Sequence, residues 1–344
     1  MFIRNAWYVA GLSVEFGRDM KALRILGADV VIFRRTDGSA AALEDACPHR
    51  RVPLSMGRVE GDRIVCGYHG LTFDGAGRCV AAPTQPDAIP SRARVKSYPV
   101  IDRYEFLWIW MGDAAQADPA KLIDIPNFYN PAWGKTDPGH LEMACNYLWI
   151  MENLLDPSHV AWVHVTSFAG GGTDDVALQS EITDEGVIVF RWINDRPAPP
   201  YYAPRLRFTG HCDRKQHYEV RMPSTAINKS VFAPAGTGGD DNALPEAAFV
   251  NYSYNFMTPV DAAHTRYFWF QHRNSDPDNE AVSQAMFEGA VSAFNEDRRI
   301  LEAVQKGMSD PARPHINLGI DAGAMRFRKM IERRIEAEQG AEPV

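Results

Sequence analysis

The chain has 344 residues, of which 45% are hydrophobic, and its formal net charge is −8. This length can bury a large core or two ordinary domains, and the negative charge excludes non-specific nucleic-acid binding, which needs a basic surface. The sequence has no apolar leader and no uninterrupted apolar run of about 18 residues. We therefore expect a cytoplasmic protein with neither a membrane nor a nucleic acid as a partner.

The first third of the chain consists of short β-rich runs separated by turns. Val30–Phe33 and Phe106–Trp110 are apolar runs rich in β-branched and aromatic residues, and Asp37-Gly38 is a turn dipeptide. A proline-studded stretch follows, which is typical of a connection between domains. The pattern predicts an all-β domain over residues 1–115 and a second domain over residues 116–344.

Two mixed Cys/His pairs, Cys47-x-His49 and Cys66-x₂-His69, lie close together in the first domain. Two thiolates and two imidazoles suit either one structural zinc ion or a two-iron cluster. Zinc loops usually pair like with like, whereas here each loop has one cysteine and one histidine. The order favours a two-iron cluster, with each loop giving one ligand to each iron. A zinc-stabilised interaction module is the weaker alternative.

The second domain is expected to have an α+β organisation. It begins with a helix-like segment from Tyr147 to about Val160, and it ends with helices at about Glu280–Lys306 and Met325–Glu338. The strand candidates between these helices are Val187–Phe190, Val231–Phe232, Phe249–Phe256 and Tyr267–Phe270.

The first of these helical segments contains a group of possible metal ligands. Asn153, Asp156 and His159 recur at every third position, so on a helix they form one polar stripe. His159 and His164 are five residues apart, about 140° out of phase on a regular helix. A shared metal therefore requires a helix end or a widened turn between them, which Pro157 can supply. The alternative is a helix with two satisfied histidines.

The long helix near the C-terminus has a carboxylate in its apolar stripe. The stripe consists of Ala290, Phe294, Asp297, Leu301 and Val304. Burying Asp297 is costly unless it is paired with an arginine or bound to a metal, while Glu296 falls outside the stripe and needs no such explanation. His159, His164 and Asp297 together form a two-histidine, one-carboxylate set, which holds non-haem Fe(II) with open positions.

These motifs resemble those of a known enzyme family. Cys47-x-His49-Arg50 and Cys66-x₂-His69-Gly70-Leu71-x-Phe73 resemble the Rieske [2Fe-2S] motif of the ring-hydroxylating and demethylating oxygenases. Asn153-x₂-Asp156-x₂-His159-x₄-His164, with the late Asp297, resembles their mononuclear iron motif. The likeness extends over nearly the whole chain. It implies an N-terminal all-β Rieske domain and a C-terminal catalytic domain of antiparallel sheet and helix, of the helix-grip, START-like kind.

The resemblance also implies the cofactors. The cluster ligands would be Cys47 and Cys66 on the inner iron and His49 and His69 on the outer iron. His159, His164 and Asp297 would hold Fe(II), where O2 reacts. Electrons would come from NAD(P)H through a separate ferredoxin or flavin reductase, because the chain has no nucleotide-binding fingerprint.

In this family the oxygenase is typically a homotrimer in which electrons cross between subunits. The resemblance makes Asp156 the bridge, hydrogen-bonded to His69 across the interface and to His159 on its own chain, and Asn153 a second catalytic residue. Separately, the cluster loops carry an excess of arginine, which suits an acidic electron donor, although solvation of a surface loop explains it equally well. These residues are Arg50, Arg51, Arg58 and Arg63.

Within the family the chain is similar to vanillate O-demethylase, toluenesulfonate methyl-monooxygenase and dicamba O-demethylase. This implies a monooxygenase of aromatic catabolism that attacks a methyl or methoxy group of an aromatic acid. O-demethylation of a vanillate-like methoxybenzoate is favoured over hydroxylation of a toluate or toluenesulfonate. Asn228 and Asn255 are candidate substrate contacts, and Arg205, Arg207 and Arg221 are candidates for binding the acid group. A non-enzymatic Rieske electron carrier is the alternative, and the facial triad counts against it.

Overall fold

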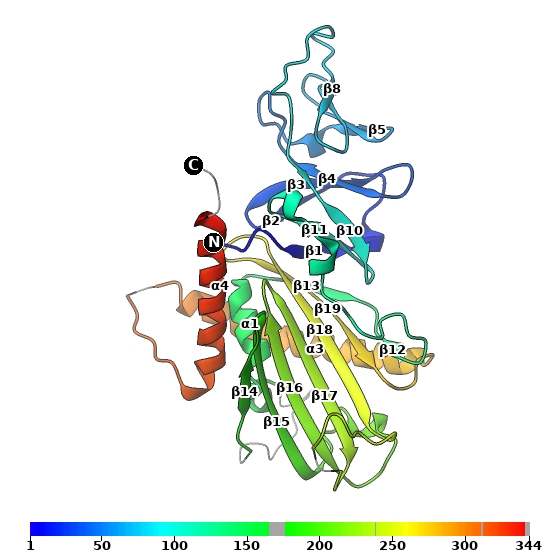
Figure 1. Ribbon diagram of the computed structural model, residues 1–344, viewed down its shortest axis with the longest axis vertical. Helices are drawn as coiled ribbons and strands as arrows, with labels where there is room; N and C mark the ends of the chain where they lie inside the picture. The colour runs from blue at the N-terminus through cyan, green and yellow to red at the C-terminus, as the bar shows by residue number, and fades with distance from the viewer. Residues whose placement is uncertain (165–175, 238, 311, 341–344) are drawn as a thin grey trace. The chain divides into compact units, whose positions relative to one another are not determined.

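The computed structural model describes residues 1–164, 176–237, 239–310 and 312–340. The chain divides into two compact units (Figure 1). The first comprises Met1–Asp124, the turn Thr258–Ala262 and the chain end from Glu338, and the second comprises Ile125–Met257 and Ala263–Ala337. The first unit thus extends beyond the boundary predicted at residue 115.

The first unit is built from small antiparallel sheets, as the short β-rich runs predict. One has the order β1 (Trp7–Leu12), β11 (Phe106–Trp110), β10 (Val100–Arg103). The second has the order β2 (Lys21–Ile25), β3 (Ala28–Arg34), β4 (Ala40–Glu44), β9 (Ser97–Tyr98). The third has the order β5 (Arg58–Glu60), β6 (Arg63–Val65), β7 (Thr72–Phe73), β8 (Cys79–Ala81). Four 3₁₀ turns connect them: Ser13–Glu15, Leu54–Met56, Ala114–Gln116 and Pro119–Lys121.

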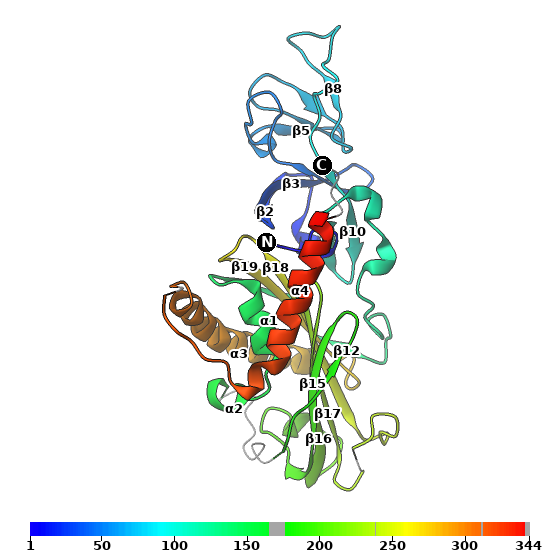
Figure 2. The same ribbon diagram turned by 60° about the vertical axis from the view of Figure 1, so that its left-hand side comes forward.

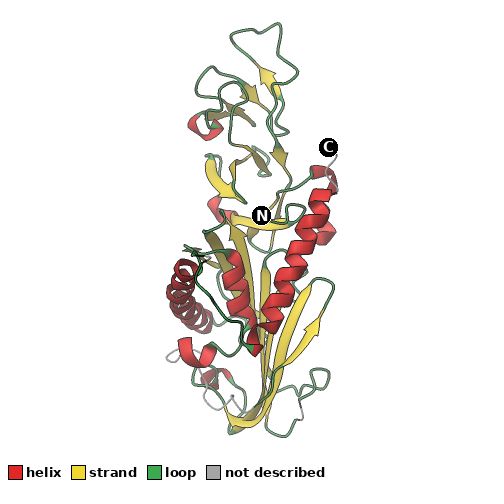
Figure 3. Cartoon of the chain, turned by 90° about the vertical axis from the view of Figure 1, so that its left-hand side faces the viewer, coloured by secondary structure: helices red, strands yellow, loops and turns green. Residues whose placement is uncertain are grey.

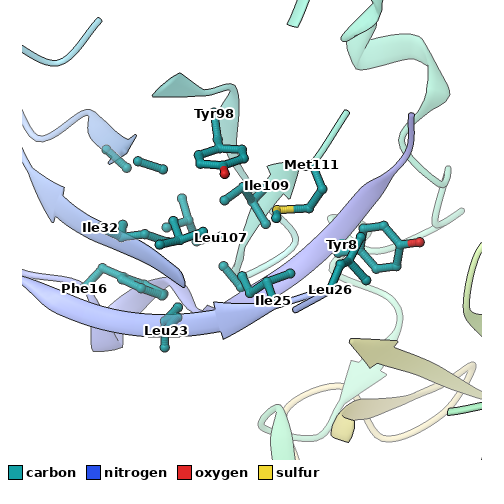
Figure 4. Close-up of a cluster of buried hydrophobic side chains, with 14 residues drawn as sticks. Tyr8, Phe16, Leu23, Ile25, Leu26, Ile32, Tyr98, Leu107, Ile109 and Met111 are labelled. Atoms are coloured by element: carbon teal, nitrogen blue, oxygen red, sulfur yellow. The ribbon is translucent and has the colours of Figure 1, made fainter. Parts of the chain in front are cut away.

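The central residues of strand β3, Val30–Phe33, are apolar, and they are buried on both faces of the strand. Val30 and Ile32 point into a core shared with β1, β2 and β11 (Figure 4). Val31 and Phe33 point the other way, into a second core that contains Cys47, Cys66 and Phe73. Successive side chains of a strand face opposite sides, so this one run of four residues supports both layers and underlies the candidate cluster loops.

The second unit is organised around one large antiparallel sheet, which confirms the predicted α+β class. Its strands follow the order β12 (Gly134–Lys135), β19 (Thr265–Arg273), β18 (Phe249–Pro259), β17 (Thr225–Pro234), β16 (His211–Arg221), β15 (Gly186–Pro197), β14 (Gln179–Ile182). Strand β13 (Gly139–Met143) also pairs with β19. Short 3₁₀ turns occupy Ala203–Arg205 and Gly319–Asp321.

Four α-helices accompany this sheet: α1 (Tyr147–Leu155), α2 (Val160–Val163), α3 (Glu280–Gly307) and α4 (Ala322–Gly340). Helices α1, α3 and α4 lie on the same face of the sheet, with α1 between the other two (Figures 2 and 3). Glu152 of α1 forms an ion pair with Arg328 of α4. None of the helices in the described ranges is long and apolar enough to cross a membrane.

Helix α3 agrees with its predicted span, whereas the first predicted helix is shorter than expected. It ends at Leu155, because Asp156 adopts extended backbone angles (φ −97°, ψ 106°) before Pro157. A residue that precedes proline is disfavoured in the helical region. The helix end that the spacing of His159 and His164 requires therefore lies at this proline, and no widened turn is needed.

Candidate metal centres and active-site cavity

The two Cys/His loops of the first unit have the same backbone design. In each loop the cysteine N–H donates to the carbonyl five residues later, and the cysteine carbonyl accepts from the N–H four residues later. This fourth residue has a positive φ in both loops, 60° at Arg51 and 74° at Gly70. Cys47 and Cys66 therefore start two equivalent turns, each of which carries its histidine near the tip.

The two cysteines and the two histidines differ in exposure. Cys47 and Cys66 are 2% exposed, whereas His49 is exposed and His69 half-buried, with ring centroids 4.7 Å apart. Together they line a space of about 170 Å³. Within the described residues, one group of three possible ligands has all its atoms within 4.8 Å of one another, and that group lies in the second unit. The four donors therefore do not converge on a single ion, and the layout fits a two-iron cluster with a buried sulfur side and an exposed imidazole side better than zinc.

Two glycines allow the second loop and strand β6 to lie close to Met56 and Gly57, which follow the first loop. A Cβ on Gly67 would lie 2.7 Å from the Met56 carbonyl oxygen, and one on Gly57 would lie 1.9 Å from the Val65 carbonyl oxygen. Both distances are too short for a side chain. Backbone packing thus requires a glycine at position 67 in the second loop, and the neighbouring sequence does not reveal this role.

In the second unit, the break after α1 positions two histidines. The Asp156 carboxylate accepts hydrogen bonds from the Ser158 N–H (2.7 Å) and hydroxyl (2.9 Å), which closes the turn that contains Pro157. His159 is the N-cap of α2 and His164 its C-cap. One short helix between them therefore brings their Nε2 atoms within 3.3 Å of each other.

The other ring nitrogen of each histidine has a defined partner. Nδ1 of His159 lies against the main-chain carbonyl of Asp156, and Nδ1 of His164 lies 2.8 Å from Glu296 Oε2. Since both partners are acceptors, each ring carries a proton on Nδ1 and turns its Nε2 toward the other ring. Burial is the main factor that lowers the pKa of His159 and keeps it neutral.

Asp297 completes this group. Its Oδ1 lies 3.3 Å from His164 Nε2 and 3.7 Å from His159 Nε2, and within the described residues it has no hydrogen-bond partner. Two imidazole nitrogens and one buried carboxylate oxygen thus lie within 4.8 Å of one another, an arrangement that a bound cation would stabilise. Two imidazoles and one carboxylate suit Fe(II) with open coordination positions. The fold therefore brings together His159, His164 and Asp297, the three ligands predicted from the sequence.

The structure shows how two neighbouring acidic residues contact the histidines. Glu296, which lies outside the apolar stripe, orients His164, because it lies about 100° around α3 from Asp297. Asp156 contacts His159 through its carbonyl oxygen, and its carboxylate binds Ser158. Asn153 Nδ2 lies 3.5 Å from His159 Nε2, which places this side chain beside the group.

The three ligand candidates form part of the wall of a cavity in the second unit. Strands β16, β17 and β18 and helix α3 supply most of its other side chains. The lining consists of Leu154, His159, Val160, His164, Tyr202, Arg214, Tyr218, Asn228, Ser230, Asn251, Ser253, Gln271, Phe294 and Asp297. The lining thus combines three aromatic side chains, Tyr202, Tyr218 and Phe294, with a larger number of polar groups, which can orient a small organic molecule through hydrogen bonds.

The two asparagines proposed as substrate contacts have different surroundings. Asn228 lines the cavity and donates to the Leu154 carbonyl (2.9 Å). Asn255 is fully buried and is not among the lining residues. Its amide nitrogen donates to Asn228 Oδ1 (3.1 Å) and its Oδ1 accepts from the Tyr267 hydroxyl (2.8 Å). Asn255 therefore orients Asn228 from behind.

None of the three arginines considered for an anionic substrate, Arg205, Arg207 and Arg221, lines this cavity. The arginine that does is Arg214 on β16. Strand β16 is buried on both faces from Cys212 to Gln216. The sequence therefore shows no alternation of apolar and polar residues from which the burial of Arg214 could be predicted.

Comparison with known proteins places this chain in a family. Residues 6–99 match the Rieske [2Fe-2S] domain, and residues 143–337 match the vanillate O-demethylase oxygenase C-terminal domain. The chain belongs to the Rieske non-haem iron oxygenases. The second match covers more than half of the chain and contains the facial triad, which excludes a simple electron carrier.

Full-length relatives agree with this assignment. The oxygenase component is 38% identical, over 99% of both chains, to a putative toluene-4-sulfonate monooxygenase iron–sulfur subunit of Comamonas testosteroni. It is 34% identical to a vanillate O-demethylase oxygenase subunit of a Pseudomonas species, over 99% of this chain and 97% of the relative. The crystal structure of dicamba monooxygenase bound to 3,6-dichlorosalicylic acid superposes with a TM-score of 0.88 at 30% identity, covering 99% of each chain.

The predicted family, fold class and cofactors are thereby confirmed. The protein is an oxidoreductase, the oxygenase component of a multicomponent system, with a Rieske [2Fe-2S] cluster and a non-haem iron.

The Gly67 contact predicts a selective loss of the cluster. In Gly67→Ala the new methyl group collides with the Met56 carbonyl and displaces the second loop, so we expect most of the visible absorption of the cluster to disappear. Gly17→Ala is the matched control, because nothing lies within 4 Å of its Cβ position. A Gly67→Ala protein with a full cluster spectrum would contradict the close approach.

The Glu296 contact predicts a selective loss of mononuclear iron. Glu296→Ala removes the acceptor that orients His164, and loss of such a partner weakens metal binding about 10- to 100-fold. Glu296→Gln keeps an acceptor without charge and should give a smaller loss. Exposed Glu288 on the same helix provides the control Glu288→Ala. Iron titration of protein with an intact cluster measures the effect, and equal affinities in all three variants would be inconsistent with it.

Proposed function

We propose that this oxygenase hydroxylates a methyl or methoxy group of an aromatic acid, with O-demethylation of a vanillate-like methoxybenzoate favoured over methyl hydroxylation. The observation that carries the proposal is that His159, His164 and Asp297 line a cavity that also contains the aromatic side chains of Tyr202, Tyr218 and Phe294. The relatives named for vanillate, dicamba and toluene-4-sulfonate support attack on substituted aromatics. A hydroxylated methoxy group gives a hemiacetal, which releases formaldehyde and leaves a phenol.

We assign the cofactor ligands as follows. In the second unit they are His159, His164 and Asp297, and in the first unit Cys47, Cys66, His49 and His69. Iron held by the facial triad would supply the dioxygen chemistry, and the cluster would supply the electrons. The Asp156 carbonyl and the Glu296 carboxylate hold the imidazole protons on Nδ1 of His159 and His164. Asp297 is buried and so is shielded from water.

We further propose that the oxygenase is a homotrimer in which Asp156 connects the cluster of a neighbouring subunit to His159. Asp156 lies in a surface depression of about 740 Å³ that also contains Asn153 and Trp149. Ile300 and Ile320 in its wall are 45% and 48% exposed. Exposed apolar side chains around a functional carboxylate support coverage by another subunit.

A separate reductase would deliver the electrons, and we propose that arginines near the cluster loops attract it. Arg51 and Arg58 form exposed ion pairs with Glu44 and Glu60. Arg50 and Arg63 have no ion pair in the described part of the chain, so their charge is available to an acidic partner. If attraction of charge speeds docking, raising the ionic strength slows cluster reduction.

The activity is tested with purified oxygenase, a compatible reductase and a panel of methoxy- and methyl-substituted benzoates and benzenesulfonates. Substrate-dependent oxygen uptake is expected for at least one of them. Formaldehyde in equal amount to the oxygen consumed identifies O-demethylation, and a hydroxymethyl product identifies methyl hydroxylation. A protein with about three irons per chain that oxidises none of the panel would refute the proposed substrate class.

The bridging role predicts that Asp156→Asn keeps both metal centres and loses nearly all turnover. The contact with His159 uses the main-chain carbonyl, and an asparagine Oδ1 still accepts from Ser158, so the mononuclear ligands stay in place. Iron content and cluster spectrum should be unchanged while product formation falls at least about 100-fold. Asp184→Asn changes an exposed carboxylate of the same unit and is the control. Normal product formation by Asp156→Asn would refute the proposed role of Asp156 in electron transfer between subunits.

A further inference from the structure

Arg214 lies on strand β16 and faces the active-site cavity. Arg214 and Tyr218 are both lining residues, and as alternate positions of one strand they share a face. Across the ladder Arg214 pairs with Phe232 on β17, and Tyr218 pairs with Asn228. Arg214 is only 6% exposed, so its cation is held inside the protein.

This buried guanidinium has no anionic partner among the described residues. Its Nε has no hydrogen-bond partner there, and Asp297, the one carboxylate among the described lining residues, faces the two histidines instead. Burying an unpaired cation is strongly unfavourable. The arrangement therefore calls for an anion from outside the described part of the chain.

The adjacent Arg191 shows what a satisfied arginine looks like on this face. Its Nε donates to Gln216 Oε1 at 2.7 Å, and its Nη1 donates to the Val176 carbonyl at 3.2 Å. Gln216 lies between Arg214 and Tyr218 on the same side of β16, yet it binds Arg191. Arg214 is thus left to the cavity, while its neighbour is used by the protein itself.

The surroundings hold the Arg214 side chain without neutralising it. Its Cζ lies 5.4 Å from the centroid of the Phe232 ring, a cation–π contact. Burial raises the pKa of Tyr218 to about 12, even though the Arg214 charge acts to lower it. Tyr218 is therefore a neutral phenol, able to donate a hydrogen bond to the same anion, and is not a counter-ion.

We propose that Arg214 binds the acid group of the substrate, a carboxylate or a sulfonate, and so selects anionic aromatics. The assignment deepens the proposed function and rests on it. Arg214 lies four residues from Tyr218, about 13 Å along the strand, and the partner of Tyr218, Asn228, bonds the helix that leads to the triad. The acid group is held away from the ligand set, and the ring between them lies among aromatic side chains.

The test measures binding without turnover, by anaerobic calorimetry on the holoenzyme with two matched pairs: 4-methoxybenzoate with 4-methoxybenzamide, and toluene-4-sulfonate with its sulfonamide. Wild-type protein should bind each anion at least about 30-fold more tightly than its neutral analogue, and Arg214→Gln should weaken anion binding about 10- to 100-fold. Binding of the neutral analogues should change less than about threefold. The pairs separate carboxylate from sulfonate as the preferred group.

Arg207→Gln is the matched control, because Arg207 is exposed and lies outside the cavity lining. It should leave every affinity unchanged. Equal loss of anion and neutral binding in Arg214→Gln, or no loss, would overturn the assignment. If this variant does not fold, Arg214→Lys keeps the charge and should retain the preference for anions, and a wild-type ratio near one would by itself refute the proposal.

The outcome is distinguishable from failure of the proposed function. Wild-type enzyme that oxidises methoxyarenes with no preference for anions keeps the function and removes the role of Arg214. Wild-type enzyme that binds benzoates through Arg214 but oxidises no methyl or methoxy group keeps the anion site and removes the proposed reaction.

Discussion

The feature on which the active site depends is the convergence of two imidazole nitrogens and one buried carboxylate oxygen. Nε2 of His159, Nε2 of His164 and Oδ1 of Asp297 lie within 4.8 Å of one another, and a cation between them would stabilise all three. Two hydrogen-bond acceptors, the Asp156 carbonyl and the Glu296 carboxylate, hold the imidazole protons on the opposite nitrogens. These outer acceptors orient the two imidazoles so that their Nε2 atoms can bind a metal ion.

The helix break at Pro157 makes this convergence possible. A continuous helix would place His159 and His164 about 140° apart, whereas a turn followed by the four-residue helix α2 puts one histidine at each end of it. The same break exposes a main-chain carbonyl, which satisfies His159 and leaves the Asp156 carboxylate for the turn and the surface. One proline therefore sets both the ligand geometry and the proposed path of the electron.

The cavity depends on the sheet in a similar way. Residues of β16 alternate between the cavity and the outer face, and both faces are buried around Arg214. Asp213, next to it, points to the other side and accepts from the main chain of Asp195 and Thr237. A buried carboxylate and a buried arginine can thus be adjacent in sequence without neutralising each other, which leaves the arginine for a ligand.

The amino-acid sequence by itself determined the metal-binding motifs and the α+β class, because these depend on residue types at short, regular spacings and on hydrophobic periodicity, and the resemblance of the motifs to known proteins indicated the family. Asp297 could be predicted because a carboxylate in an apolar helical stripe is physically anomalous. Only the tertiary structure decided the roles of Glu296, Gly67, Asn255 and Arg214. Each of these roles is a contact between segments far apart in the chain, and neither local propensity nor period encodes which side chains such packing brings together.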